Sequence, residues 1–187
     1  PGTRIDAFVD ATTATGTTSA IMIHDGREAQ QIARLHTSAD KPVRATPLPA
    51  PPPLRSNGLP PQLNLRTALR VDVPLVAPEG SPAAWIPPAR FSSTAAPAFR
   101  VKRGRTVVLA LTNAATTPTV FHLHGHHVRL LDRLDDGWKP FWLDTLLIDA
   151  GQTQRIAFAA DFPGAWLMEA MAVEWSAPRR VRWFAVE

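Results

Sequence analysis

The sequence contains no cysteine and no tyrosine among its 187 residues. Without cysteine the chain cannot form disulfides, supply a thiolate nucleophile or bind zinc through sulfur. The same absence leaves the redox compartment of the protein undetermined. The sequence therefore excludes several classes of catalytic and structural site before any motif is considered.

The chain also lacks a strong excess of either charge. It has 20 basic and 16 acidic side chains, a formal net charge of +4. Arginines are scattered singly, and the densest pair, Arg179-Arg180, has no ladder of aromatic residues beside it of the kind that stacks on bases. We therefore expect no nucleic-acid partner. No apolar run reaches 18 residues, so no membrane span is expected, and Pro1–Arg4 does not read as a signal peptide.

Proline is abundant, with 19 residues, while apolar residues make up 45% of the chain. Each proline lacks an amide donor and clashes with the preceding helical turn, so this composition opposes long helices. The sequence is long enough to bury a core. An all-β fold with proline-rich connections is predicted.

The first 61 residues divide into two parts. Alternating or β-branched runs predict strands at residues 4–10, 19–24 and 31–36. Three strands are too little sheet to be stable alone, so residues 1–40 are interpreted as the closing strands of a domain whose other part is missing from this sequence. Residues 41–61 are dominated by proline among small and polar residues and read as an extended linker.

Residues 62–187 read as a second domain rich in strands. Short strand-like runs recur at spacings typical of a β-sandwich, and no amphipathic helix is predicted. The expected strands are residues 68–73, 98–101, 106–112, 121–131, 142–148, 154–158, 165–171 and 182–186. Turns are expected at residues 102–105, 135–137 and 161–164. Two antiparallel sheets packed face to face would bury the apolar sides of these strands.

The run Phe121–His127 holds four of the six histidines. In a strand, successive side chains point to opposite faces, so three of these histidines would share one face, with Phe121 and Leu123 on the other. The three are His122, His124 and His126. Neutral imidazole is a common ligand of copper and zinc, which makes this face a candidate metal site. The alternative is that the imidazoles bond to nearby backbone or lie in solvent. His24 and His36 are isolated, and both are interpreted as structural.

Several short motifs follow one another along the second half of the chain. They are Trp85-Ile86, Phe91, Val101 to Gly104, Asn113, His122 to His126, Asp144-Thr145 and Asp161 to Trp166. Their order resembles the third, C-terminal cupredoxin domain of the multicopper oxidases, the laccase-like family. The resemblance implies a cupredoxin-like Greek-key β-sandwich for residues 62–187. Residues 1–40 look like the end of the family's middle domain, and the first domain is absent.

The resemblance implies roles for individual residues. The family's histidine-rich strand places two trinuclear-cluster ligands on His122 and His124, while the first histidine, a blue-copper ligand, falls on Thr119. The remaining positions of the family's copper ligands carry other residue types. The later His-Cys-His motif falls on Glu169, Ala170 and Met171, the following histidine on Trp175, and the axial ligand on Arg180.

These replacements predict that the chain has no blue-copper centre. Blue copper needs two imidazoles and a thiolate, and a guanidinium is a fixed cation that cannot bind copper. The copper cluster would need further histidines from elsewhere, although a remodelled site made by His122 and His124 with Glu169 and Met171 stays open. By the resemblance His126 is structural, and His127 points away from the metal face. The tryptophans are expected to pack in the core or on the surface of a sheet, Met168 is expected to pack in the core, and Asp144-Thr145 is expected to stabilise a turn.

Two functional hypotheses follow from the resemblance. In one, the chain is the C-terminal part of a multicopper oxidase that couples oxidation of phenols or metal ions to dioxygen reduction, is inactive by itself, and needs its N-terminal cupredoxin domains or another copy of the chain. In the other, it is a copper-free binding or structural protein resembling the family members associated with bacterial cell division. Both place it in the periplasm or outside the cell. No serine-histidine-acid order, phosphate loop or paired-carboxylate spacing argues for hydrolysis.

Overall fold

The computed structural model describes residues 7–24, 27–53, 55–56, 58–78, 80–92, 95–131, 138–174 and 176–187, without the side chains of residues 138–141. The described chain forms two units, one within residues 7–58 and the other within residues 59–187. Three positions lie outside the described residues: the dipeptide Asp25-Gly26, whose sequence is typical of a turn, the expected turn at 135–137, and the expected ligand position Trp175. Among the described helices, none is long and apolar enough to cross a membrane.

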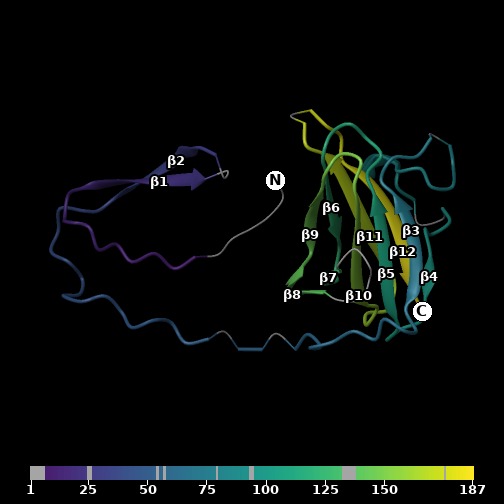
Figure 1. Ribbon diagram of the computed structural model, residues 1–187, viewed down its shortest axis with the longest axis horizontal. Helices are drawn as coiled ribbons and strands as arrows, with labels where there is room; N and C mark the ends of the chain where they lie inside the picture. The colour runs from purple at the N-terminus through teal and green to yellow at the C-terminus, as the bar shows by residue number, and fades with distance from the viewer. Residues whose placement is uncertain are drawn as a thin grey trace. The chain divides into compact units, whose positions relative to one another are not determined.

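The first unit contains one antiparallel hairpin, β1 (Thr18–His24) and β2 (Ala29–His36), with an irregular register between Ile21 and Met22 (Figure 1). The strands predicted at 19–24 and 31–36 are therefore confirmed. The strand predicted at 4–10 is wrong as far as it can be followed, because residues 7–10 form no strand. The described residues between 37 and 68 contain no helix or strand, as expected of a proline-rich linker. The boundaries proposed at 40 and 61 remain predictions.

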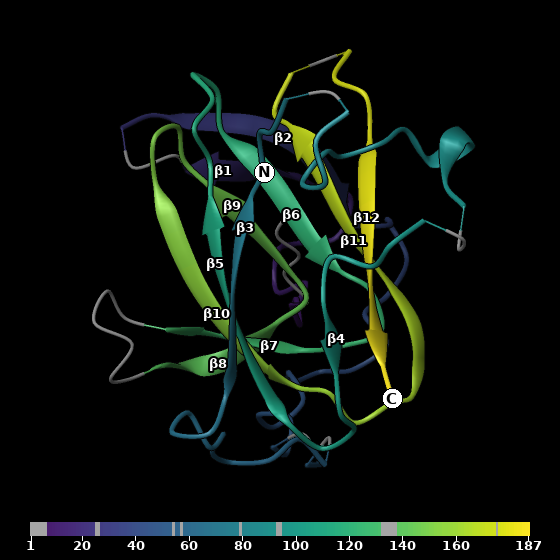
Figure 2. The ribbon, with the colours of Figure 1, turned by 90° about the vertical axis from the view of Figure 1, so that its right-hand side faces the viewer.

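The second unit is a sandwich of two five-stranded sheets, seen as two layers in Figure 2. The first sheet has the order β3-β5-β10-β7-β8 and the second the order β4-β12-β11-β6-β9. The first comprises β3 (Leu69–Pro74), β5 (Thr106–Thr112), β10 (Thr153–Ala159), β7 (Val128–Leu131) and β8 (Trp138–Leu143). The second comprises β4 (Arg100–Val101), β12 (Arg180–Val186), β11 (Gly164–Ala172), β6 (Thr119–Leu123) and β9 (Thr145–Ile148). A single 3-10 turn, Pro88–Arg90, completes the described elements, so the all-β prediction is confirmed.

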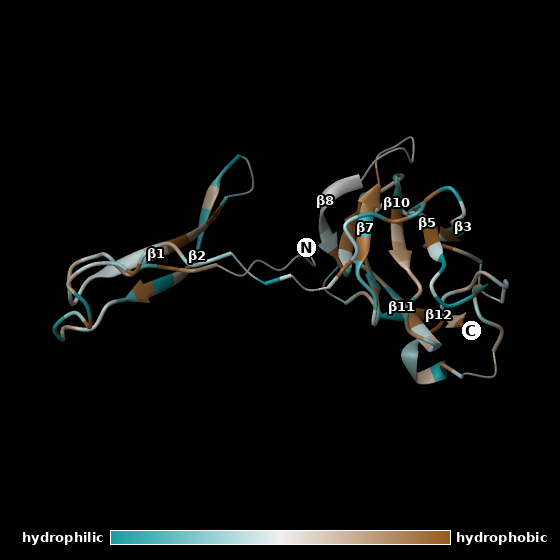
Figure 3. Ribbon diagram, turned by 90° about the horizontal axis from the view of Figure 1, so that it is seen from below, coloured by the Kyte–Doolittle hydropathy of each residue, from teal (hydrophilic) through white to brown (hydrophobic). Residues whose placement is uncertain are grey.

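The core lies between the two sheets. Phe121, Phe158 and Phe184 are fully buried there, and Phe158 and Phe184 meet edge to face with ring centroids 5.6 Å apart. Strand β5 is apolar along nearly its whole length because a smaller cluster, containing Leu63 and Val108, covers the outer face of the same sheet. Figure 3 shows the resulting hydrophobic colour along β5 and β7.

Two predicted strands are each split in the structure. The histidine-rich run ends as a strand at Leu123 and resumes only at Val128, because Gly125 turns the chain with φ +70°. The predicted strand 142–148 changes sheets at Asp144: β8 pairs with β7 in the first sheet, and β9 pairs with β6 in the second. Alternation of apolar residues cannot reveal either break, since apolar side chains continue on both sides of it.

Candidate metal centre

His122 and His124 lie together on the outer side of β6 and the turn that follows it. Their neighbours Phe121 and Leu123 are fully buried, so strand alternation holds over this part of the run. The two imidazole rings have centroids 4.4 Å apart and planes inclined by 69°. The structure thus brings together two of the three histidines that the sequence placed on one face.

The His122 ring is held in one orientation by backbone and side-chain oxygens. Its Nδ1 lies 2.9 Å from the carbonyl oxygen of Asp144 and 2.9 Å from Thr145 Oγ1. Because a carbonyl can only accept, this contact places the proton on Nδ1 and leaves the lone pair on Nε2. A metal-binding histidine is commonly fixed in this way through its other ring nitrogen. His122 is therefore arranged to donate its Nε2 lone pair.

His124 faces a carboxylate from the neighbouring strand. Its Nε2 lies 3.4 Å from Glu169 Oε2, and Glu169 stands directly opposite His122 in the register of β6 and β11. Arg179 binds the same carboxylate with both arms of its guanidinium, Nε to Oε1 at 2.9 Å and Nη2 to Oε2 at 2.6 Å. This Arg179 hydrogen bond is the main reason why the pKa of Glu169 is lowered. The carboxylate beside His124 is already neutralised by a fixed cation.

Met171 shares the outer face of β11 with Glu169, while the residues between and before them point inward. Ala170 is 5% exposed and Met168 is fully buried, as expected for Met168. Within the described residues, no three side chains of histidine, aspartate or glutamate are grouped so as to hold a metal. The remodelled site with Glu169 and Met171 therefore gains no geometric support, and Arg179 occupies the carboxylate that it would need.

The positions expected to carry blue-copper ligands do not fit that metal. Thr119 is buried at the start of β6, Ala170 packs in the core, and Arg180 Nη1 lies 3.5 Å from the carbonyl oxygen of Trp85. None of these groups is an imidazole or a thiolate, which blue copper requires. A guanidinium near the axial position would also repel a copper ion.

His126 lies inside the sandwich, away from the other two histidines. It is 4% exposed and contacts the rings of Phe158, Phe184 and Trp166 at centroid distances of 5.1, 5.5 and 5.0 Å. Its Nδ1 donates to the carbonyl oxygen of His124 at 3.2 Å. The expectation from alternation that His126 shares the metal face is wrong, because the turn at Gly125 rotates the chain by the time it reaches residue 126.

We expect the stability of the sandwich to fall as pH decreases from about 7 to about 5, in part through His126. Burial lowers the pKa of His126, so the folded state resists protonation while the unfolded state binds a proton below its ordinary pKa. The unfolded state then holds more protons, and the free energy of unfolding decreases with falling pH. Urea denaturation at several pH values should show that the free energy of unfolding of His126→Gln changes less with pH than that of the parent protein. The exposed neighbour variant His127→Gln is the control; an identical pH slope in all three proteins would refute this role of His126.

Sequence reasoning missed the group that controls the candidate site. Arg179 was considered only as half of a basic pair, and its contact with Glu169 depends on the chain that joins β11 to β12. Asp144 and Thr145 were expected to tie a turn; they also fix the His122 ring. One signal in the sequence could have indicated this ion pair. Glu169 was expected on the same strand face as Met171, and the basic pair Arg179-Arg180 follows ten residues later.

Comparisons with known proteins agree on one family. A family model described as multicopper oxidase matches residues 61–186. Laccase-4 of Oryza sativa subsp. japonica is 37% identical over 70 residues, which are 36% of this chain and 12% of the laccase. The chain therefore spans only a small part of the length of that relative.

Solved structures show the same fold at low identity. A multi-copper oxidase from Pseudomonas thermotolerans matches with a TM-score of 0.66 and 23% identity, covering 93% of this chain and 41% of the oxidase. Lac15 from a marine microbial metagenome matches with a TM-score of 0.62 and 22% identity, covering 92% of this chain and 39% of Lac15. These likenesses establish a cupredoxin-like β-sandwich.

Proposed function

Because the chain belongs to the multicopper oxidase family, we propose that it is the C-terminal portion of such a protein and presents His122 and His124 to a copper cluster. The remaining ligands come from other domains of the same protein or from another copy of the chain. Copper bound there would supply one-electron redox chemistry toward dioxygen, with phenols or metal ions as the class of reductant. The chain has no blue-copper centre and is inactive by itself.

The observation that carries this proposal is the fixed His122 ring beside His124. A contact with a backbone carbonyl keeps the His122 Nε2 lone pair available, and the second imidazole lies at a centroid distance of 4.4 Å. Two imidazoles alone bind copper weakly, which is why the proposal requires ligands from elsewhere. The Glu169 carboxylate is bound by Arg179 and so supplies no further ligand beside the two histidines.

The copper-free hypothesis gains no support from the comparisons, which name oxidases and a laccase. Location in the periplasm or outside the cell remains part of the proposal and rests on the family alone. The function of the assembled protein is therefore proposed to be copper-dependent oxidation, with this chain contributing part of the cluster.

Copper binding tests the two histidines directly. We expect His122→Ala and His124→Ala each to lower the affinity for Cu²⁺ at least about tenfold, since each variant removes one imidazole ligand. Isothermal titration of the 187-residue chain measures this, with the exposed His127→Ala as the matched control. The copper-loaded chain should show no intense absorption near about 600 nm, because that band requires a copper-thiolate bond. Unchanged affinity in both variants would show that the two histidines are structural.

A further inference from the structure

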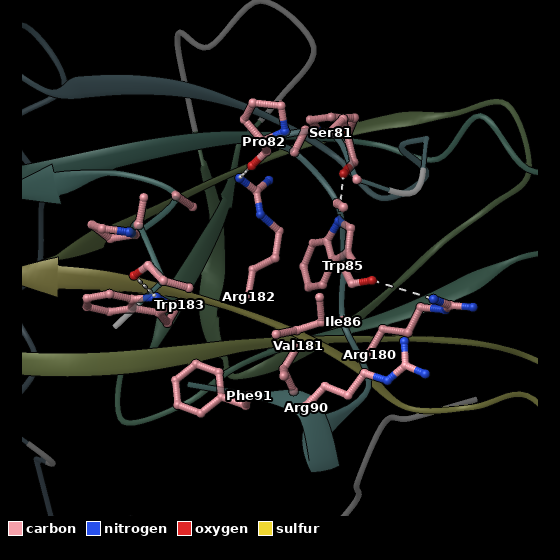
Figure 4. A pocket seen from close by; sticks show the side chains of 18 of the residues that line it. Ser81, Pro82, Trp85, Ile86, Arg90, Phe91, Arg180, Val181, Arg182 and Trp183 are labelled. Carbon is pink, nitrogen blue, oxygen red and sulfur yellow. Dashed lines mark hydrogen bonds between the residues drawn. The ribbon is translucent and has the colours of Figure 1, made fainter. Parts of the chain in front are cut away.

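A pocket of about 730 Å³ lies on the sandwich between residues 80–92 and 95–98 on one side and the start of β12 on the other (Figure 4). Part of its wall comes from Asp72 and Pro74 of β3. Main-chain contacts join the two sides: Ile86 and Val181 exchange hydrogen bonds at 3.1 and 2.8 Å, and Ala98 donates to the carbonyl oxygen of Trp183 at 2.7 Å. The pocket is therefore framed by hydrogen-bonded backbone.

Three guanidinium groups line this pocket, those of Arg90, Arg180 and Arg182. The only carboxylate among its described lining residues is Asp72, and within the described chain none of the three arginines forms an ion pair. Figure 4 shows the side chains of Arg90 and Arg180 extending toward the same side of the pocket. The pocket thus carries an excess of positive charge, three guanidinium groups against one carboxylate.

Arg182 is the most constrained of the three. Its side chain is half-buried, its Nη2 donates to the carbonyl oxygen of Pro82 at 3.3 Å, and its guanidinium carbon lies 5.9 Å from the centre of the Trp85 ring. Burial lowers the pKa of Arg182, which reflects the cost of holding this cation partly away from water. A buried cation without a carboxylate partner is stabilised when an anion binds beside it.

Aromatic side chains provide an apolar surface in the same pocket. Trp183 and Phe91 are partly exposed and line it, and the indole nitrogen of Trp183 donates to the carbonyl oxygen of Ala95 at 3.2 Å. That hydrogen bond fixes the ring, so the indole can receive a flat ligand without losing further side-chain freedom. Small-ligand sites typically combine apolar walls with a few polar groups in this way.

We infer that this pocket binds a small aromatic carboxylate, with its carboxylate group on the arginines that line the pocket and its ring against Trp183 and Phe91. The planar guanidinium fork matches a carboxylate, and the two aromatic rings match a flat apolar body. The site requires no copper and does not include His122 or His124. It is therefore independent of the proposed oxidase function.

Binding of benzoate to the 187-residue chain tests the site, measured by isothermal titration and by fluorescence of the pocket tryptophans. We expect a dissociation constant of about 1 mM or tighter, and affinity for the neutral isostere benzamide at least about tenfold weaker, because charged hydrogen bonds to arginine are lost. Inorganic phosphate should bind more weakly than benzoate, since it has no ring to place on Trp183.

Variants locate the binding within the pocket. Arg182→Gln and Arg180→Gln should each weaken benzoate binding about tenfold, whereas Arg66→Gln, an exposed arginine outside the pocket, should leave it unchanged. Arg90→Gln alters only an exposed side chain, and it should weaken binding even if Arg182→Gln fails to fold. No detectable benzoate binding by the folded parent at about 10 mM overturns the inference, as does an affinity in both Arg90→Gln and Arg180→Gln that equals that of the parent. Phosphate binding tighter than benzoate also overturns it.

Discussion

Asn113→Asp is expected to destabilise the sandwich by about 4 kcal/mol, because it places a charged acceptor where the fold needs a donor. Asn113 is fully buried, and its Nδ2 donates to the carbonyl oxygens of Thr117 at 2.9 Å and Ile148 at 3.0 Å. Its Oδ1 accepts from the amide of Ala115 at 3.1 Å. The substituted carboxylate would face those carbonyl oxygens with no proton to share.

Urea denaturation followed by tryptophan fluorescence measures this loss selectively. All six tryptophans lie in residues 59–187, so their signal reports the sandwich and not the hairpin unit. Asn64→Asp is the matched control: Asn64 is exposed, and its Oδ1 accepts from the amide of Arg66, which an aspartate can also do. We expect less than about 0.5 kcal/mol for the control. Equal losses in the two variants would contradict the role given to the Asn113 amide.

Gly125→Ala is expected to cost about 4 kcal/mol, the sum of a strained backbone and an atomic overlap. Gly125 has φ +70°, which a residue with a Cβ adopts unfavourably, and a Cβ there would lie 2.0 Å from the ring of Trp166. That ring is itself held, because its indole nitrogen donates to the carbonyl oxygen of Phe162 at 2.8 Å. The clash cannot be relieved by a small movement of a flexible side chain.

Gly104→Ala separates the two contributions. Gly104 has a similar φ of +78°, but no atom lies within 4 Å of its added Cβ. It should therefore lose only the backbone part, about 1 kcal/mol. The comparison is made by thermal and urea unfolding of both variants. If Gly125→Ala proved no worse than Gly104→Ala, the Trp166 ring would have to move freely, contrary to its hydrogen bond.

Much of the fold could be predicted because the rules involved are local. Proline content argued against helices, and short strand-like runs located β3, β5 and β10 to within a residue or two. The strand ends at Gly125 and Asp144 were not predicted. Both depend on which sheet the chain joins next, and that is a property of the whole sandwich. The partly buried Trp166 ring makes Gly125 necessary, and that ring lies far away in sequence.

The candidate site was predictable to the same degree. The pair His122 and His124 follows from strand alternation in a His-x-His sequence. The ion pair between Glu169 and Arg179 does not follow from strand alternation, because Arg179 comes close to Glu169 only when β11 and β12 have paired. His126 was placed on the wrong face by alternation, although the resemblance gave it the correct structural role.

The pairing of strands distant in sequence has a consequence for how the protein forms. Strand β6 finds its partner β11 with His122 opposite Glu169, and the short β4 pairs with β12 near the end of the chain. Proteins dominated by such long-range pairs fold slowly, in about milliseconds to seconds, because closing a long loop loses entropy before the contacts that offset this loss can form. During synthesis, β6 leaves the ribosome well before β11. The face that carries the two histidines therefore cannot be completed until β11 has been synthesised.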